Sequence, residues 1–144
     1  MKLRDILRTK GADVVQIAPD RPVLDAVRLL TEHRIGALVV TRDGEILGVI
    51  SERDVMNLVA ERPESVRDTT VADIMTTDVI VAVPDDDLDY VMNVMTNNRI
   101  RHLPVVGDGS LVGIVSIGDV VNEVRRTAEA ENRHLKDYIQ GVTR

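Results

Sequence analysis

Apolar residues in this chain alternate between short continuous runs and a spacing of three and four residues, and the same succession occurs twice. Continuous apolar runs of this length predict buried strands, and the i, i+3, i+4, i+7 spacing predicts a helix. In the first copy the strands are expected at 14–17, 37–40 and 46–50, and the helix carries Val23, Ala26, Val27 and Leu30. In the second copy the strands are expected at 79–83, 102–106 and 111–115, and the helix carries Leu88, Val91, Met92 and Met95.

The last two strands of each copy are separated by an Asp-Gly pair, at Asp43-Gly44 and at Asp108-Gly109. Such a pair between apolar runs is a strong hairpin signal, because Gly tolerates a positive φ. A second helix is expected after each hairpin, so each copy is a β-α-β-β-α unit of the α/β class. One face of such a small sheet needs a partner, and the other copy supplies it.

The two copies align without a gap at an offset of 65 residues. Between 13–56 and 78–121, 15 of the 44 aligned pairs are identical. Two copies, rather than three or more, predict a pseudo-two-fold pair that closes on itself instead of an open solenoid. We place the first repeat, with an N-terminal helix, at 1–66 and the second, with a C-terminal helix, at 67–144, together forming one compact module. The polar connector between the copies ends in a short amphipathic turn at 71–75.

The chain after Asp119 is expected to remain helical to about Gln140, with Gly141 as the stop. A heptad-like stripe follows alternating steps of four and three residues through 117, 121, 124, 128, 131, 135 and 138. We expect this stripe to pack against the N-terminal helix, through Leu3, Ile6 and Leu7, or against the same tail of a second chain.

Composition narrows the class of function. Of the 144 residues, 44% are hydrophobic, yet the chain has no Phe, Trp or Cys and only two Tyr, so the core is built from aliphatic side chains. The lack of stacking aromatics and the net charge of −6 argue against nucleic-acid binding. The N-terminal segment is too charged for a signal peptide and no apolar run is long enough for a membrane span, so a cytoplasmic protein is expected.

Each hairpin ends in Ser-x-x-Asp, at Ser51–Asp54 and at Ser116–Asp119. Ser followed by an acid three residues later before an apolar helix is a capping box. The same groups suit a nucleotide, because a carboxylate accepts two hydrogen bonds from a ribose diol and a helix N-terminus attracts phosphate. Both readings can hold together. A glycine three residues before each Ser permits close approach of a neighbouring group.

Basic residues precede the fourth strand, at Arg99, Arg101 and His102. In a strand, the two arginines would share one face and His102 would take the other. A guanidinium offers planar, bidentate donors to phosphate. The alternative is that these are solvated surface charges. The first repeat has Gly36-Ala37 at the positions of Arg101 and His102, where Arg53 could compensate.

The segments "RIGALVVTRDGEILGVISERDV" and "RIRHLPVVGDGSLVGIVSIGDV" carry a family resemblance that covers roughly residues 10–125. They resemble the cystathionine β-synthase (CBS) domain pair, or Bateman module, here of a stand-alone bacterial or archaeal type. The resemblance implies an adenosine-containing ligand in a cleft between the repeats, a regulatory effect on a partner protein, and a flat homodimer. AMP is the ligand most expected, then ATP, ADP or NAD.

The family pattern also implies roles for single residues. The Asp of each Ser-x-x-Asp would contact ribose and the Ser would contact phosphate, and Arg101 and His102 match the family's basic pair. One site would then combine Ser116, Asp119, Arg99, Arg101 and His102 with an adenine wall of Val79, Ile80, Ile100 and Pro104. The other would combine Ser51, Arg53 and Asp54 with Val14, Val15 and Ile35. Taken singly, the apolar members are ordinary core residues.

The favoured function is a regulatory module that senses an adenine nucleotide and acts on an effector protein that the sequence does not identify. The alternative is a structural dimerisation module whose clefts bind nothing. An enzyme is not expected, because the chain has no Cys and no Lys-bearing phosphate loop. No metal site is expected either, because the three His fall on different elements without ligand spacing.

Overall fold

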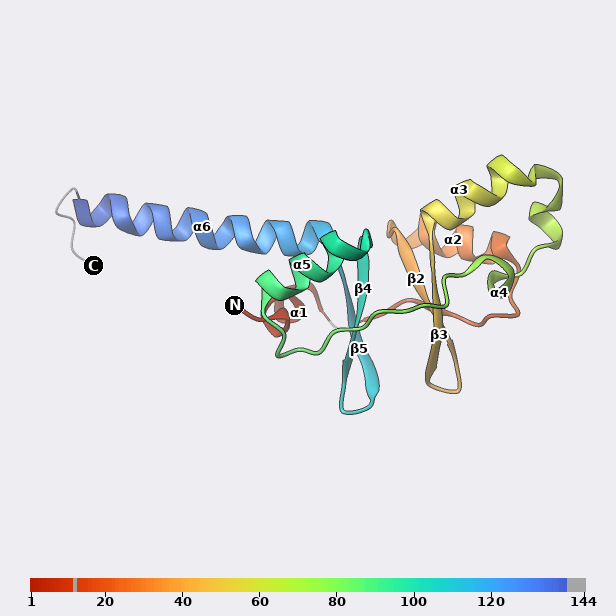
Figure 1. The fold of residues 1–144 in the computed structure, drawn as a ribbon, viewed down its shortest axis with the longest axis horizontal. Helices are drawn as coiled ribbons and strands as arrows, with labels where there is room; N and C mark the ends of the chain where they lie inside the picture. Colours follow the sequence, from red (N-terminus) through yellow and green to blue (C-terminus); the bar gives the residue numbers. More distant parts are fainter. Residues whose placement is uncertain (12, 140–144) are drawn as a thin grey trace.

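The computed structural model describes residues 1–11 and 13–139, and contains two α/β halves side by side (Figure 1). The first half comprises β1 (Gln16–Ile17), α2 (Val23–His33), β2 (Ala37–Arg42), β3 (Glu45–Ser51) and α3 (Glu52–Glu61). The second half comprises α5 (Leu88–Asn98), β4 (His102–Gly107), β5 (Ser110–Ser116) and α6 (Ile117–Ile139). The remaining elements are α1 (Leu3–Lys10), the 3-10 helix η1 (Pro63–Asp68) and α4 (Val71–Ile74). The predicted α/β class and the two tandem repeats are confirmed.

Each half is built on an antiparallel hairpin, β2–β3 and β4–β5. The Asp-Gly turns have positive φ at both positions, 52° and 80° in the first and 51° and 78° in the second, as a tight two-residue hairpin turn requires. Both hairpins also shift register at the equivalent position, between Val40 and Thr41 and between Val105 and Val106.

The first strand of each repeat is shorter than predicted. In the first half only Gln16–Ile17 pairs, parallel to β2. In the second half the expected strand at 79–83 is reduced to a single parallel bridge between Ala82 and Val105. Pro84, which ends this segment, lacks the N–H that would extend a ladder, and Pro19 is its equivalent.

The helix α1 precedes the first half in the chain but packs on the second, and α4 precedes the second half but packs on the first. Lys2 bridges Asp87 of the second repeat, and Thr70 bridges Pro22 of the first. The supporting backbone hydrogen bonds match as well, since the N–H of Leu88 donates to Met1 O and the N–H of Val23 donates to Thr69 O, at 3.0 and 2.9 Å. The N-terminal helix, which we assigned to the first repeat, therefore completes the second.

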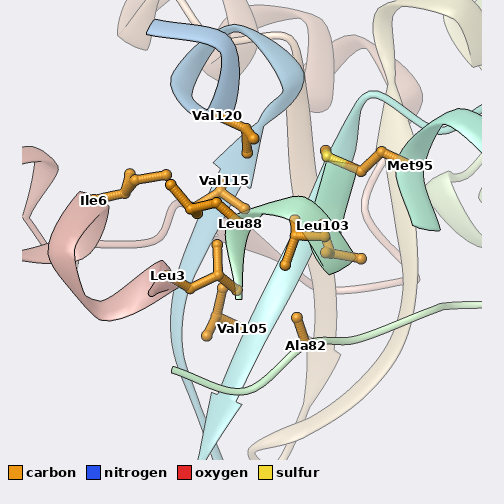
Figure 2. Close-up of a cluster of buried hydrophobic side chains, with 10 residues drawn as sticks. Leu3, Ile6, Ala82, Leu88, Met95, Leu103, Val105, Val115 and Val120 are labelled. Atoms are coloured by element: carbon orange, nitrogen blue, oxygen red, sulfur yellow. The ribbon is translucent and has the colours of Figure 1, made fainter. Parts of the chain in front are cut away.

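Figure 2 shows the consequence for the core of the second half. Leu3 and Ile6 of α1 are buried among side chains of all the other elements of that half: Ala82, Leu88, Val91, Met95, Leu103, Val105, Val115 and Val120. The first half has a separate core, in which Val71 of α4 holds the position equivalent to Leu3. The two cores are aliphatic, as the composition predicts.

The helix α6 projects well beyond the body of the protein (Figure 1). Its first turns pack on the second core through Val120, Ile117 and Val124. Of the predicted stripe, Ile117 and Val124 lie on this face, whereas Val121 is 48% exposed and the buried position beside it is Val120. The outer stripe residues Leu135 and Tyr138 are exposed. The predicted stop at Gln140 and Gly141 lies outside the described residues.

Candidate functional site

Both Ser-x-x-Asp motifs cap helices. At α3, the N–H of Ser51 donates to Asp54 Oδ2 at 2.9 Å, and the N–H of Asp54 donates to Ser51 Oγ at 3.4 Å. At α6, the same two bonds join Ser116 and Asp119 at 2.8 and 3.1 Å. The capping interpretation is confirmed at both sites. In each carboxylate the cap uses Oδ2, and Oδ1 forms no hydrogen bond with the residues that the structure describes.

A cavity of about 380 Å³ opens beside Asp54, between the two halves. From the first half it is lined by Gly36, Val49, Ser51, Glu52, Arg53, Asp54 and Met56. From the connector and the second half it is lined by Thr76, Asp78, Val79, Ile80, Arg99, Ile100, Arg101, His102 and Pro104. The cavity therefore joins a Ser-x-x-Asp to the basic segment and to an apolar wall.

The cavity groups these residues differently from our expectation. We placed Arg99, Arg101 and His102 with Ser116 and Asp119 of their own repeat, and the cavity brings them to the Ser-x-x-Asp of the other repeat. His102 also pairs with Ser116 across the β4–β5 ladder. The predicted apolar wall of Val79, Ile80, Ile100 and Pro104 lines the same cavity. The cause is how the halves meet, because the start of β4 lies against the start of β2. A Cβ built on Gly36 would be 2.9 Å from His102 Nε2.

The remaining predicted residues lie elsewhere. Ser116, Asp119, Val14, Val15 and Ile35 do not line this cavity. Val15 and Ile35 pack against the first core. Sequence reasoning did not find Val49, Glu52, Met56, Thr76 or Asp78, because the path of the connector past β3 brings Thr76 and Asp78 to the cavity. No sequence motif signals that path.

The basic residues also differ from the strand geometry that we expected. The strand β4 begins at His102, so Arg99 and Arg101 precede it. Arg99 ends α5 in the left-handed conformation, with φ 55°, and Arg34 ends α2 in the same way with φ 54°. This turn, rather than strand alternation, brings Arg99 and Arg101 to the cavity.

The cavity contains charges of both signs. Arg53, Arg99 and Arg101 have exposed side chains, and none forms an ion pair within 4 Å among the residues that the structure describes. Asp54 and Asp78 supply carboxylates on the same lining. Unpaired guanidinium groups beside a helix N-terminus favour a bound anion.

His102 lies between the cavity and the second Ser-x-x-Asp. Burial lowers the pKa of His102, and the positive charges of Lys10 and Arg101 act in the same direction. The carboxylates of Glu52 and Asp119 oppose them without reversing the shift. The imidazole is therefore neutral at pH 7 and can accept a hydrogen bond.

The second Ser-x-x-Asp has a different neighbour. Lys10 Nζ donates to Asp119 Oδ2 at 2.6 Å and to Ile114 O at 2.9 Å. Burial would raise the pKa of Asp119, but the hydrogen bonds from Lys10 and from the N–H of Ser116, with the charge of Lys10, hold it below its usual range. Asp119 is thus an ion-paired carboxylate, whereas Asp54 borders an open cavity.

A further hollow of about 400 Å³ lies between β1 and α2. Its two arginines, Arg21 and Arg28, both pair with Asp25, at 2.8 and 3.1 Å. It contains none of the predicted site residues. Within the part of the chain that the structure describes, no helix is both long and apolar enough to cross a membrane.

Comparison with known proteins agrees with this architecture. The sequence model of the CBS domain matches residues 3–61 and again residues 71–126. The chain belongs to the CBS-domain family. The CBS domain-containing protein CBSX3, mitochondrial, of Arabidopsis thaliana is 38% identical over 148 residues, covering 96% of this chain and 72% of the relative.

Solved CBS pairs have the same fold. A CBS-domain containing protein from Agrobacterium tumefaciens is 40% identical with a TM-score of 0.83, covering 85% of this chain and 98% of that chain. The CBS domain pair of protein MJ0100 is 26% identical with a TM-score of 0.79, covering 88% and 98% of the two chains. That structure is a complex with 5-methylthioadenosine and S-adenosyl-L-methionine.

Proposed function

We propose that this CBS pair is a regulatory module that binds an adenine nucleotide in the cavity beside Asp54 and thereby acts on a partner protein. The observation that carries the proposal is the lining of that cavity, where a capping carboxylate, an apolar wall and three arginines meet, and these arginines form no ion pair with the residues that the structure describes. The adenosine ligands of the MJ0100 pair support the same class of ligand. No catalytic step is part of the proposal.

Each part of a nucleotide has a matching group on the lining. Oδ1 of Asp54 accepts from a ribose hydroxyl while Oδ2 keeps the helix cap. Arg99 and Arg101 bind the phosphate from the second half, and Arg53 approaches from the helix mouth. The adenine lies against the wall of Val79, Ile80, Ile100 and Pro104.

The guanidinium groups of the lining favour adenosine ligands that bear a phosphate. Three guanidinium groups stabilise a phosphate and oppose the sulfonium of S-adenosylmethionine. We therefore place AMP first, followed by ATP, ADP or NAD. The ligand acts on a partner only by binding one conformation of the pair more tightly than another.

A thermal-shift screen against AMP, ADP, ATP, NAD and S-adenosylmethionine tests the proposal. A nucleotide at about a hundred times its Kd adds roughly 2.7 kcal/mol, which raises Tm by several degrees. Asp54→Asn keeps an oxygen for the helix cap and is expected to lose the shift. Asp89→Asn, at an exposed position in the first turn of α5, is the matched control and keeps it. If no nucleotide shifts the wild type, the clefts are degenerate and the pair is a dimerisation module.

We also propose that the protein is a homodimer that forms through α3 and α6. Both helices expose apolar side chains at equivalent positions, Met56 at 70% and Val121 at 48%, and Val59 of α3 is 49% exposed. Exposed apolar groups at equivalent positions of both helices favour a protein interface over solvent. The effector protein is not identified, and the cytoplasmic location stays a prediction.

A further inference from the structure

The two Ser-x-x-Asp sites of the pair are not equivalent. Both have the same cap, yet Asp54 borders the open cavity and Asp119 is ion-paired with Lys10. The pair with Lys10 is only partly exposed, at 37% for the Lys10 side chain and 27% for that of Asp119. The sequence repeat contains no hint of this difference, because Lys10 precedes the aligned region.

The difference comes from the length of the helix that leads into each site. The helix α4 ends at Ile74, and two residues later Thr76 pairs with Val49 of β3 through both backbone bonds, at 2.9 and 3.0 Å. The corresponding helix α1 has eight residues instead of four and ends at Lys10. Gly11 then ends the helix with φ 96°.

The extra turn of α1 places a side chain where, in the other half, a residue after α4 makes a backbone contact. Ile114 of β5 is the equivalent of Val49, 65 residues later. Val49 O accepts from the N–H of Thr76, whereas Ile114 O accepts from Lys10 Nζ at 2.9 Å. The ammonium group thus takes the place of a backbone amide, and from there it also reaches Asp119.

Leu7 of α1 also packs on β5, through its apolar side chain. A Cβ built on Gly113 of β5 would lie 2.5 Å from Leu7 Cδ2, so the helix α1 rests directly on the strand that leads to Ser116. In the other half, the equivalent Gly48 is approached by Met75 and by the backbone oxygen of Thr76. Both glycines permit close approach, but only the helix that packs on Gly113 also carries a lysine, Lys10, that pairs with the Asp of the adjacent Ser-x-x-Asp.

We propose that Lys10 is a built-in occupant of the second CBS site, which holds Asp119 and limits the protein to one nucleotide per chain, bound beside Asp54. This inference rests on the proposed function. The second site becomes available to a ribose-bearing ligand only when Lys10 is removed or displaced. Because Gly36 and Ala37 stand where the first site has Arg101 and His102, the released site prefers a nucleoside such as adenosine over a nucleotide.

Binding stoichiometry, measured by isothermal titration with AMP and with adenosine, tests the assignment. The wild type is expected to bind one AMP per chain. Lys10→Met keeps the apolar stem without the charge, and we expect it to bind a second equivalent, of adenosine most strongly. Lys10→Met combined with Asp119→Asn is expected to return to one. Lys2→Met is the matched control, because Lys2 pairs with the exposed Asp87 at 3.1 Å, and it keeps one.

Three outcomes would contradict the inference, and they can be told apart. A wild type that already binds two equivalents shows that Lys10 does not block the site. A Lys10→Met variant that is folded by circular dichroism and still binds one equivalent of either ligand overturns the role of Lys10 and leaves the proposed function intact. If neither protein binds AMP or adenosine, the proposed function fails and the inference fails with it.

Discussion

At the scale of single residues, the capping groups have a second role that depends on their surroundings. The bonds between Ser and Asp are the same in both halves, so the chemistry of the motif does not distinguish the sites. What distinguishes them is the neighbour of the carboxylate, an open cavity for Asp54 and an ammonium group for Asp119. A motif of four residues is therefore too short to predict which site is open.

His102 makes stability depend on pH. Its pKa is lowered in the folded protein, whereas the unfolded chain takes up the proton near pH 6.5. As pH falls below about 6.5, the unfolded state binds more protons than the folded state, so the free energy of unfolding decreases until the folded pKa is passed. Urea unfolding at pH 5.5 and 7.5 measures this decrease.

The variant His102→Gln is the control for that pH dependence, since it keeps a polar side chain of similar reach without titrating in this range. We expect the difference in free energy of unfolding between pH 5.5 and 7.5 to be smaller in the variant than in the wild type. An equal difference in the two proteins would show that His102 is not the source.

At the scale of elements, the exchange of α1 and α4 between the halves makes the N-terminal helix part of the second core. Leu3 is fully buried there. We expect Leu3→Ala to cost roughly 2–5 kcal/mol in free energy of unfolding, as buried Leu→Ala changes do. Chemical denaturation followed by circular dichroism measures it.

Leu135→Ala in the outer part of α6 is the matched control for Leu3→Ala. Leu135 is 58% exposed, so the same substitution is expected to change stability by no more than about 0.5 kcal/mol in the monomer. A cost at Leu3 as small as at Leu135 would contradict the exchanged packing of α1. A large cost at Leu135 would instead show that a second chain covers this part of α6.

Elements with strong local signals were predictable from the sequence. The Asp-Gly turns, the hairpins and the helix of each repeat follow from turn chemistry and apolar spacing. The strand at 79–83 was not, because the segment forms only the bridge at Ala82. On α6, the core of the single chain takes the face through Val120 and leaves the stripe residue Val121 exposed, which spacing alone does not settle.

At the scale of the whole molecule, the repeat predicted the pair but not how its halves face each other. Because the two repeats align at an offset of 65 residues, the sequence does not show whether Arg101 lies beside Asp119 of its own repeat or beside Asp54 of the other. The packing of β4 against β2, read from the contact of Gly36 with His102, brings Arg101 to the cavity beside Asp54. Long-range geometry of this kind is absent from a single sequence.

The homodimer is also a property of the whole molecule. Light scattering is expected to give about twice the chain mass of 15.9 kDa, and Met56→Glu is expected to lower it by placing a charge on the apolar surface of α3. Glu61→Gln, an exposed change at the end of the same helix, is expected to leave the mass unchanged. A wild-type mass of a single chain at tens of micromolar would contradict the dimer.

The central claim is that an adenine nucleotide binds beside Asp54, and a crystal structure grown with saturating AMP tests it most directly. We predict ribose hydroxyls within hydrogen-bond distance of the Asp54 carboxylate, the phosphate against Arg99 and Arg101, and Lys10 still on Asp119. Density for AMP at Asp119 or outside both sites, or a cavity beside Asp54 without AMP at a saturating concentration, would contradict the claim.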